Sequence, residues 1–279
     1  MTLKYFIAYS LALFLNPLIV AQSPLNLMTW NVESDGADPQ VIAEQLKELS
    51  GFQIYALTEV DKRNFDLFES ACGKNFKSIE GTHKENDHLQ IIYDDSVLKL
   101  ESWTEIEDYA GYAFNRPDRA LRCPLLGRFV IRQSGKSFQV VVNHLARGNA
   151  KFRQQQAKGL REWGRNQTVP TISIGDFNFD FVFKTRQGNR AFQEFTQDNV
   201  WKWIEPEELI DSNWYDADRD GKDDYPGSIL DFAFVTGPAK SWNWKCEVIQ
   251  RPGDFPDDKT TSDHRPLKLQ WIPNANANE

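Results

Sequence analysis

The chain has 279 residues, of which 41% are hydrophobic and 26% are charged, and its formal net charge is −8 at pH 7. This length is enough for one large domain with a well-buried core. The acidic balance argues against a protein that coats nucleic acid non-specifically, although a cleft that holds a metal ion and a few arginines can still be locally positive.

The N-terminal residues have the pattern of an export signal. Lys4 gives a positive start, residues 6–20 are almost wholly apolar, and Ala21 is a small residue suited to cleavage. The alternative is an uncleaved membrane anchor, but the run is shorter than the roughly 20 apolar residues that a spanning helix needs, and Asn16-Pro17 interrupts it. We therefore expect a signal peptide over residues 1–21, a secreted or periplasmic protein, and no transmembrane segment in the mature chain.

Periodic apolar runs predict secondary structure along the rest of the chain. In chain order we expect a strand over 25–30, a helix from Asp38-Pro39 that ends before Gly51, a strand over 52–57, a helix over 64–71, a strand over 89–93, a hairpin of strands 129–132 and 138–143, a helix over 149–165, and strands over 171–174, 229–235, 244–249 and 267–271. The strands and helices mix without strict alternation, which indicates an α+β mixed-sheet sandwich. We expect one domain over residues 22–273 and a disordered tail over 274–279.

Polar side chains stand at the ends of several predicted strands. They are Asn31, Glu59, His144, Asp176 and Asp231. Polar groups that repeatedly end buried strands indicate one cleft at the rim of a sheet, where ligand sites collect. Oxygen ligands suit a hard divalent cation such as Mg²⁺, so the pattern predicts a metal-dependent hydrolase.

Six short motifs carry a resemblance to a known superfamily. In chain order they are Trp30-Asn31, Thr58-Glu59, Asn143-His144-Leu145, Gly175-Asp176-Phe177-Asn178, Leu230-Asp231-Phe232 and Ser262-Asp263-His264. A single triplet is weak evidence, but the ordered set resembles the endonuclease/exonuclease/phosphatase superfamily from about residue 25 to residue 270. The resemblance implies a four-layer α+β sandwich, with two mixed β-sheets packed face to face and helices outside. It also implies a catalytic domain over 22–273 that hydrolyses a phosphoester by in-line attack of water.

The same resemblance assigns a cation site. Glu59 is similar to the principal metal carboxylate, Asn31 would supply an amide oxygen nearby, and Asp263 would be a further carboxylate at or around the metal. The expected cofactor is Mg²⁺ or Mn²⁺, which would neutralise the charge that develops on the phosphate.

Five residues are similar to the family's catalytic groups. Asp176 would orient or deprotonate the attacking water, and Asn178 would hold a phosphate oxygen or Asp176 itself. Asp231 is the candidate acidic partner of His264, and His144 would lie across the phosphate. An imidazole can act as an acid or a base near neutral pH, so the division of roles between the two histidines stays open.

The branch of the superfamily also stays open. Asn143-His144-Leu145 favours the deoxyribonuclease and sphingomyelinase side, because the abasic-site endonucleases usually have a tyrosine motif there. Asn31-Val32-Glu33 instead has the acid that the abasic-site enzymes carry. Thr58 replaces the usual Gln before the metal glutamate, which puts any supporting role of that position in doubt.

Arginines supply the expected phosphate contacts. Arg116, Arg119 and Arg122 precede a strand, and Arg122 best matches the family arginine that binds phosphate. Arg147 follows His144 closely and is expected to face the same cleft. The alternative is an ordinary solvated loop.

A second metal site is predicted in an acidic loop. Asp216, Asp218, Asp220 and Asp224 occupy positions one, three, five and nine, with Gly221 at position six. This spacing is typical of a loop that wraps Ca²⁺. The Glu that an EF-hand carries at position twelve is missing, so we expect a structural calcium site of the extracellular kind; the alternative is an acidic solvated loop.

The substrate is the most open prediction. We expect a phosphoester, with an extracellular nuclease acting on DNA or RNA as first choice and a sphingomyelinase-like or other small-molecule phosphoesterase as alternative; a catalytically inactive binding module is a third class. We expect a monomer. The three cysteines, Cys72, Cys123 and Cys246, serve in buried packing or form a single disulfide whose pairing the sequence does not select.

Overall fold

The computed structural model describes residues 24–82, 87–115, 122–254 and 260–273. The predicted signal peptide, the predicted C-terminal tail, Arg116 and Arg119 lie outside these ranges. None of the helices in the described ranges has the length and apolar character needed to cross a membrane.

Two six-stranded sheets form the centre of the molecule. The first contains, in spatial order, β13 (Asn243–Val248), β14 (Leu267–Ile272), β1 (Leu25–Asn31), β2 (Ile54–Val60), β4 (His88–Asp94) and β3 (Phe76–Glu80). The second contains β11 (Lys202–Trp203), β12 (Ser228–Thr236), β10 (Thr171–Val182), β9 (Ser137–His144), β8 (Leu125–Ile131) and β5 (Leu98–Glu105). Both sheets are mixed, because β1 pairs in parallel with β2 and β9 with β10, whereas the other pairs are antiparallel. The short strands β6 (Asp108–Tyr109) and β7 (Tyr112–Ala113) form a separate ribbon.

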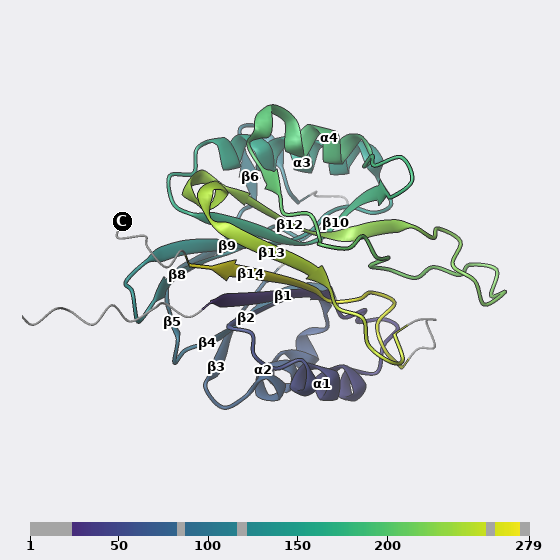
Figure 1. Cartoon of the computed structure of the whole chain (residues 1–279), viewed down its shortest axis with the longest axis horizontal. Coiled ribbons are helices and arrows are strands. Elements are labelled where there is room, and N and C mark those ends of the chain that lie inside the picture. Colours follow the sequence, from purple (N-terminus) through teal and green to yellow (C-terminus); the bar gives the residue numbers. More distant parts are fainter. Residues whose placement is uncertain (1–23, 83–86, 116–121, 255–259, 274–279) are drawn as a thin grey trace, which may run out of the picture.

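Helices cover the outer face of each sheet (Figure 1). The first sheet is covered by α1 (Pro39–Glu48) and α2 (Phe65–Cys72), and the second by α3 (Ala150–Arg165) and α4 (Arg190–Thr196). Two helices begin at residues whose side chains cap the first turn: Asp38 accepts from the Gln40 N–H at 2.8 Å, and Asn149 accepts from the Phe152 N–H at 2.9 Å. The arrangement confirms the four-layer α+β sandwich.

The apolar side chains fill the spaces between these layers. One buried cluster lies between the sheets and beneath α3, and a second lies between the first sheet and α1 and α2. Successive side chains of β1 point to opposite faces of the sheet, which explains the division. Leu27 belongs to the first cluster, and Met28 and Trp30 belong to the second. The apolar stripe of α3 (Phe152, Ala157, Leu160 and Trp163) is buried.

Several elements differ from the sequence prediction. β10 continues to Val182, well beyond the predicted end at residue 174, and β3, β5, β11 and α4 were not predicted. β5 lies at a sheet edge and most of its side chains are exposed, so it lacks the apolar alternation on which the prediction depends.

The three cysteines are free thiols. Cys123 and Cys246 are buried in the core between the layers, and burial raises the pKa of the Cys123 thiol to about 12. The structure therefore supports the packing role and not the single disulfide.

Candidate active site

Neighbouring strands of the second sheet bring three predicted residues together. Asp176 on β10 pairs with His144 at the end of β9 and with Asp231 on β12. Side chains of residues paired across neighbouring strands lie close to one another. The strand register therefore places one imidazole and two carboxylates side by side on three neighbouring strands.

Gly175 shows why the Gly-Asp-Phe-Asn motif has its sequence. Its φ angle is +138°, and a Cβ atom built there would lie 2.1 Å from the Asn143 carbonyl oxygen. Asp176 then accepts from the Asn178 N–H at 2.9 Å, and the ladder with β12 shifts register between Asp176 and Phe181. The motif forms a tight Asx-type turn that fixes Asp176 at the point where regular pairing stops.

The first sheet contributes Glu59 through a similar irregularity. The β2–β4 pairing shifts register between Leu57 and Val60, and Glu59 has a φ angle of 55°. A bulge re-aims a side chain that a regular strand would direct elsewhere. Glu59 accepts from the Asn31 amide at 2.9 Å, and the same amide nitrogen lies 3.3 Å from the Asp176 Oδ2 atom. Asn31 thus connects the two sheets at the site.

Glu59, His144 and Asp176 form a candidate cation site, because each offers a ligand atom within 4.8 Å of the others. The His144 Nε2 atom lies 3.5 Å from a carboxylate oxygen of both Glu59 and Asp176. Carboxylates held this close repel one another unless a cation or a proton lies between them. This donor set of two carboxylates and one imidazole fits a divalent cation.

The other two predicted metal residues, Asn31 and Asp263, lie beside this cluster. The Asn31 amide oxygen accepts from the Glu33 backbone N–H at 3.0 Å, so its nitrogen, and not its oxygen, faces the carboxylates. The Asp263 Oδ1 atom lies 3.8 Å from His264 Nε2, outside the Glu59–His144–Asp176 cluster. Asp263 therefore lies beside His264 and does not belong to the Glu59–His144–Asp176 cluster.

His264 is held by the predicted acidic partner. Its Nδ1 atom lies 2.8 Å from Asp231 Oδ2, which also accepts from the Ser212 hydroxyl at 2.8 Å. The Nε2 atom lies 4.0 Å from Asp176 Oδ2.

The protonation of this pair follows from its surroundings. Burial lowers the pKa of His264, but the carboxylates of Asp231, Asp263 and Asp176 outweigh burial and raise that pKa well above its ordinary value. Burial also raises the pKa of Asp231. The raised pKa of His264 favours the imidazolium, which donates from Nδ1 to Asp231, because three carboxylates act on this ring.

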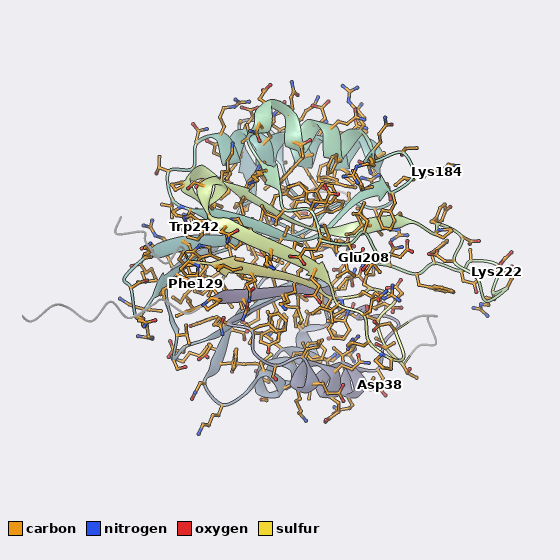
Figure 2. All side chains as sticks on the ribbon, in the orientation of Figure 1. Asp38, Phe129, Lys184, Glu208, Lys222 and Trp242 are labelled. Atoms are coloured by element: carbon orange, nitrogen blue, oxygen red, sulfur yellow. The ribbon has the colours of Figure 1, made fainter. Side chains whose placement is uncertain are left out.

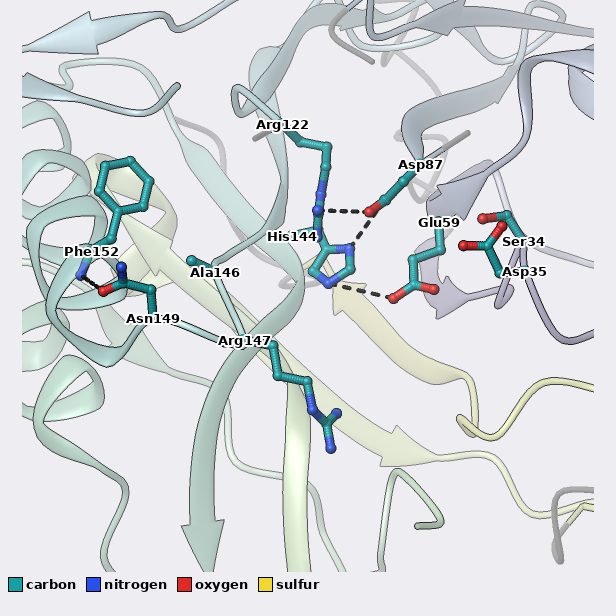
Figure 3. A pocket seen from close by; sticks show the side chains of 11 residues that line it. Ser34, Asp35, Glu59, Asp87, Arg122, His144, Ala146, Arg147, Asn149 and Phe152 are labelled. Atoms are coloured by element: carbon teal, nitrogen blue, oxygen red, sulfur yellow. Dashed lines mark hydrogen bonds and ion pairs between the residues drawn. The ribbon is translucent and has the colours of Figure 1, made fainter. Parts of the chain in front are cut away.

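His144 has its own acidic neighbour, Asp87, which the sequence analysis missed. The His144 Nδ1 atom lies 3.5 Å from Asp87 Oδ1, and Asp87 Oδ2 lies 2.6 Å from Arg122 Nη1 (Figure 3). Arg122 is therefore at the site, as predicted, with Asp87 between it and His144. Asp87 precedes β4, which runs antiparallel to β2, so the start of β4 lies beside the end of β2 that carries Glu59. A search of strand starts as well as strand ends would have found it.

The loop after β9 completes the pocket. Arg153 on α3 donates to the carbonyls of Ala146 and Arg147 at 2.8 Å each, and the Asn178 amide donates to the Leu145 carbonyl at 3.0 Å. Asn178 therefore supports this loop and, through its backbone N–H, Asp176. The pocket has a volume of about 230 Å³, and both predicted arginines line it, although the Arg147 side chain extends away from the Arg122–Asp87 pair (Figure 3).

Comparison with solved structures gives many chains of similar fold. An endonuclease/exonuclease/phosphatase family protein from Bacteroides thetaiotaomicron has a TM-score of 0.69 at 19% identity, over 93% of this chain and 99% of that one. The TDP2 protein of D. rerio, complexed with a single-strand DNA product, has a TM-score of 0.69 at 15% identity, over 90% and 100% of the two chains. This chain has the endonuclease/exonuclease/phosphatase fold.

A third structure of this fold is the mannosyl-6-phosphatase of B. thetaiotaomicron, with a TM-score of 0.67 at 18% identity, over 89% of this chain and 100% of that one. No protein-family model matches the chain, and no curated protein matches it in sequence. The endonuclease/exonuclease/phosphatase resemblance drawn from the six motifs is thus supported by three-dimensional similarity.

The predicted calcium loop lies away from this pocket, before β12. Asp216, Asp218 and Asp220 offer carboxylate oxygens within 4.8 Å of one another, and the Asp216 carboxylate accepts from the Asp220 and Gly221 N–H groups at 3.1 and 2.8 Å. Asp224 is outside this cluster, because its carboxylate accepts from the Ala217 N–H at 2.9 Å. The structure thus gathers three of the four predicted calcium residues.

Proposed function

We propose that this chain is an exported, monomeric phosphoesterase that depends on a divalent cation, Mg²⁺ or Mn²⁺. The observation that carries the proposal is the convergence of the Glu59–His144–Asp176 cluster with the buried His264–Asp231 pair. The two imidazoles lie 3.5 and 4.0 Å from the Asp176 carboxylate. Together with the neighbouring carboxylates they supply the cation site, the base and the hydrogen-bond donors that phosphoester hydrolysis needs. Structures of this fold include enzymes named as phosphatases and one bound to a DNA product, which supports the reaction class.

The cation would be held by Glu59, with Asp176 and His144 within reach. When bound, it supplies positive charge to a non-bridging phosphate oxygen. Asp176 is placed to accept the proton of the attacking water, and the Asn178 N–H keeps its carboxylate in position. Asp231 holds the Nδ1 proton of His264, so Nε2 is the atom that His264 presents to the phosphate. Arg122 and Arg147 add charge complementary to the phosphate oxygens.

Two substrate classes fit this chemistry. The first is nucleic acid, as the deoxyribonuclease-like histidine motifs suggest. The second is a small organic phosphoester, and charge favours it: among the described residues, Asp35, Glu59 and Asp87 line the pocket with two arginines, and the chain carries a net charge of −8. A polyanion binds through many cationic contacts, whereas a single phosphate needs few.

A substrate panel tests the proposal. The protein would be assayed with plasmid DNA, RNA, sphingomyelin, sugar phosphates and bis-p-nitrophenyl phosphate, with Mg²⁺ or Mn²⁺ and with EDTA. We expect the protein to hydrolyse at least one of these substrates. EDTA should abolish that hydrolysis, and added Mn²⁺ should restore it. Absence of turnover on every substrate would instead support the inactive binding module. Intact mass of the protein exported from its host would test cleavage after residue 21, and light scattering would test the monomer.

A further inference from the structure

A groove beside the catalytic pocket gathers most of the exposed large hydrophobic side chains of the described residues. Among these residues, the large hydrophobic side chains that are exposed are Trp103, Val182, Tyr215 and Tyr225, and the last three line this one groove. Its volume is about 630 Å³, within the range of pockets that bind small molecules. Exposed aromatic residues that gather in one hollow mark a recognition site more often than scattered ones do.

The two tyrosines form an aromatic platform. Their ring centres lie 5.8 Å apart with the planes tilted by 32°, and Tyr225 is 62% exposed. The Arg147 guanidinium lies 5.7 Å from the centre of the Tyr215 ring. The segment that follows, which carries Lys222, projects beyond the end of the sandwich (Figure 2).

The groove adjoins the catalytic pocket through Arg147, which lines both hollows. Asn213, which also lines the groove, forms a β-bridge with His264. A substrate whose phosphate lies beside His264 would therefore place its organic part over the tyrosines.

The polar groups of the groove accept more hydrogen bonds than they donate. Asn213 also lines the groove, but its side-chain oxygen is buried and is not open to a ligand. The carboxylates of Asp180 and Asp224 also line the groove, and Arg147 is its cationic side chain.

We propose that this groove binds the organic part of the substrate and that this part is an uncharged ring that carries several hydroxyl groups, as a sugar does. The proposal rests on the proposed phosphoesterase function. The C–H face of such a ring packs on the tyrosines, while its hydroxyls donate to the carboxylates of Asp180 and Asp224. The carboxylates repel a second phosphate, which disfavours a nucleic acid strand along the same path.

The test compares substrates with and without a ring. We would measure kcat/KM with Mn²⁺ for glucose, mannose and galactose 6-phosphates, for glycerol 3-phosphate as a hydroxyl-bearing phosphoester without a ring, and for thymidine dinucleotide. We expect a preference for at least one sugar phosphate over glycerol 3-phosphate. Tyr215→Ala and Tyr225→Ala should each lower this preference about fivefold, a typical effect of losing one aromatic packing contact. Trp103→Ala removes an equally exposed ring outside the groove and should leave the preference unchanged.

Several outcomes would overturn the proposal. One is an unchanged preference in both tyrosine variants; another is a preference for thymidine dinucleotide that these variants remove, which would indicate base stacking. If the wild type hydrolyses no phosphoester at all, the proposed function fails, and ligand-observed NMR with methyl glucoside, methyl mannoside and methyl galactoside then tests the groove alone. Saturation transfer from the wild type to a glycoside, lost in Tyr225→Ala, would support ring binding in the groove. Absence of transfer from the wild type would refute it.

Discussion

The Nδ1 atom of His264 lies 2.8 Å from Asp231 Oδ2, and both side chains are almost completely buried. The backbone of His264 is fixed as well, because its carbonyl accepts from the Trp30 indole N–H at 2.8 Å. Because Nδ1 and the main chain are held, the atom that His264 presents is Nε2. It lies 4.0 Å from Asp176 Oδ2 and 3.8 Å from Asp263 Oδ1. Asp231 is therefore a positioning residue that acts through His264.

Asp231→Asn should lower kcat by about 10²-fold or more, because an amide does not stabilise the charged imidazole and can select the wrong tautomer. KM should change little, since Asp231 does not touch the substrate. Steady-state kinetics on the best substrate of the panel measures both constants. Ser212→Ala removes the second hydrogen bond to the same carboxylate oxygen and should cost much less. Equal losses in the two variants would contradict a specific role for the His264–Asp231 contact.

Loss of the proposed base, Asp176, or of the His264 imidazole should lower kcat as much as Asp231→Asn does. Asp176→Ala and His264→Ala should each lower kcat at least about 10²-fold, the low end for loss of a general acid or base. Circular dichroism would establish that the variants remain folded. Turnover at the wild-type rate in either folded variant would refute the role assigned to that residue.

Glu59→Gln should weaken binding of the cation. The amide keeps the shape of the side chain but loses its charge, so we expect the Mn²⁺ concentration for half-maximal activity to rise about tenfold or more. Asp35→Asn is the matched control, because Asp35 lines the same pocket outside the Glu59–His144–Asp176 cluster. Calorimetric titration of Mn²⁺ into both variants separates binding from turnover. A smaller effect for Glu59→Gln than for Asp35→Asn would move the cation site away from the cluster.

The acidic loop should respond to calcium independently of the catalytic pocket. We expect Ca²⁺ to raise the melting temperature, and Asp216→Asn and Asp220→Asn to remove that rise, because both belong to the three-carboxylate cluster. Glu208→Gln changes an exposed acid outside the cluster and should retain the rise. Calorimetric scans with 5 mM EDTA or excess Ca²⁺ make the comparison. A melting temperature that does not depend on Ca²⁺ would leave the loop as a solvated acidic segment.

The sequence allowed prediction of which strands carry the site residues, because polar residues interrupt buried apolar runs. His144, Asp176 and Asp231 were found for this reason, and their strands are neighbours, although only His144 ends its strand. The same reasoning missed Asp87, since its place depends on the antiparallel pairing of β2 and β4. It also missed which end of the Asn31 amide faces Glu59, because that depends on the bulge at Glu59 and on the Glu33 N–H. Pairing and side-chain orientation arise from tertiary contacts, which the sequence pattern does not contain.

Gly175 offers a test of the turn that positions Asp176. Alanine there would adopt a φ angle of +138° with its Cβ 2.1 Å from the Asn143 carbonyl oxygen, so β9 and β10 would have to separate. We expect Gly175→Ala to lower the free energy of unfolding by at least about 3 kcal/mol, or to prevent folding. Gly148→Ala is the matched control in the loop beside the pocket, since no atom lies within 4 Å of a Cβ built there. Urea denaturation measures both variants. A Gly175→Ala protein as stable as Gly148→Ala would show that the backbone at Asp176 relaxes easily, and the tight turn would then not explain how the carboxylate is held.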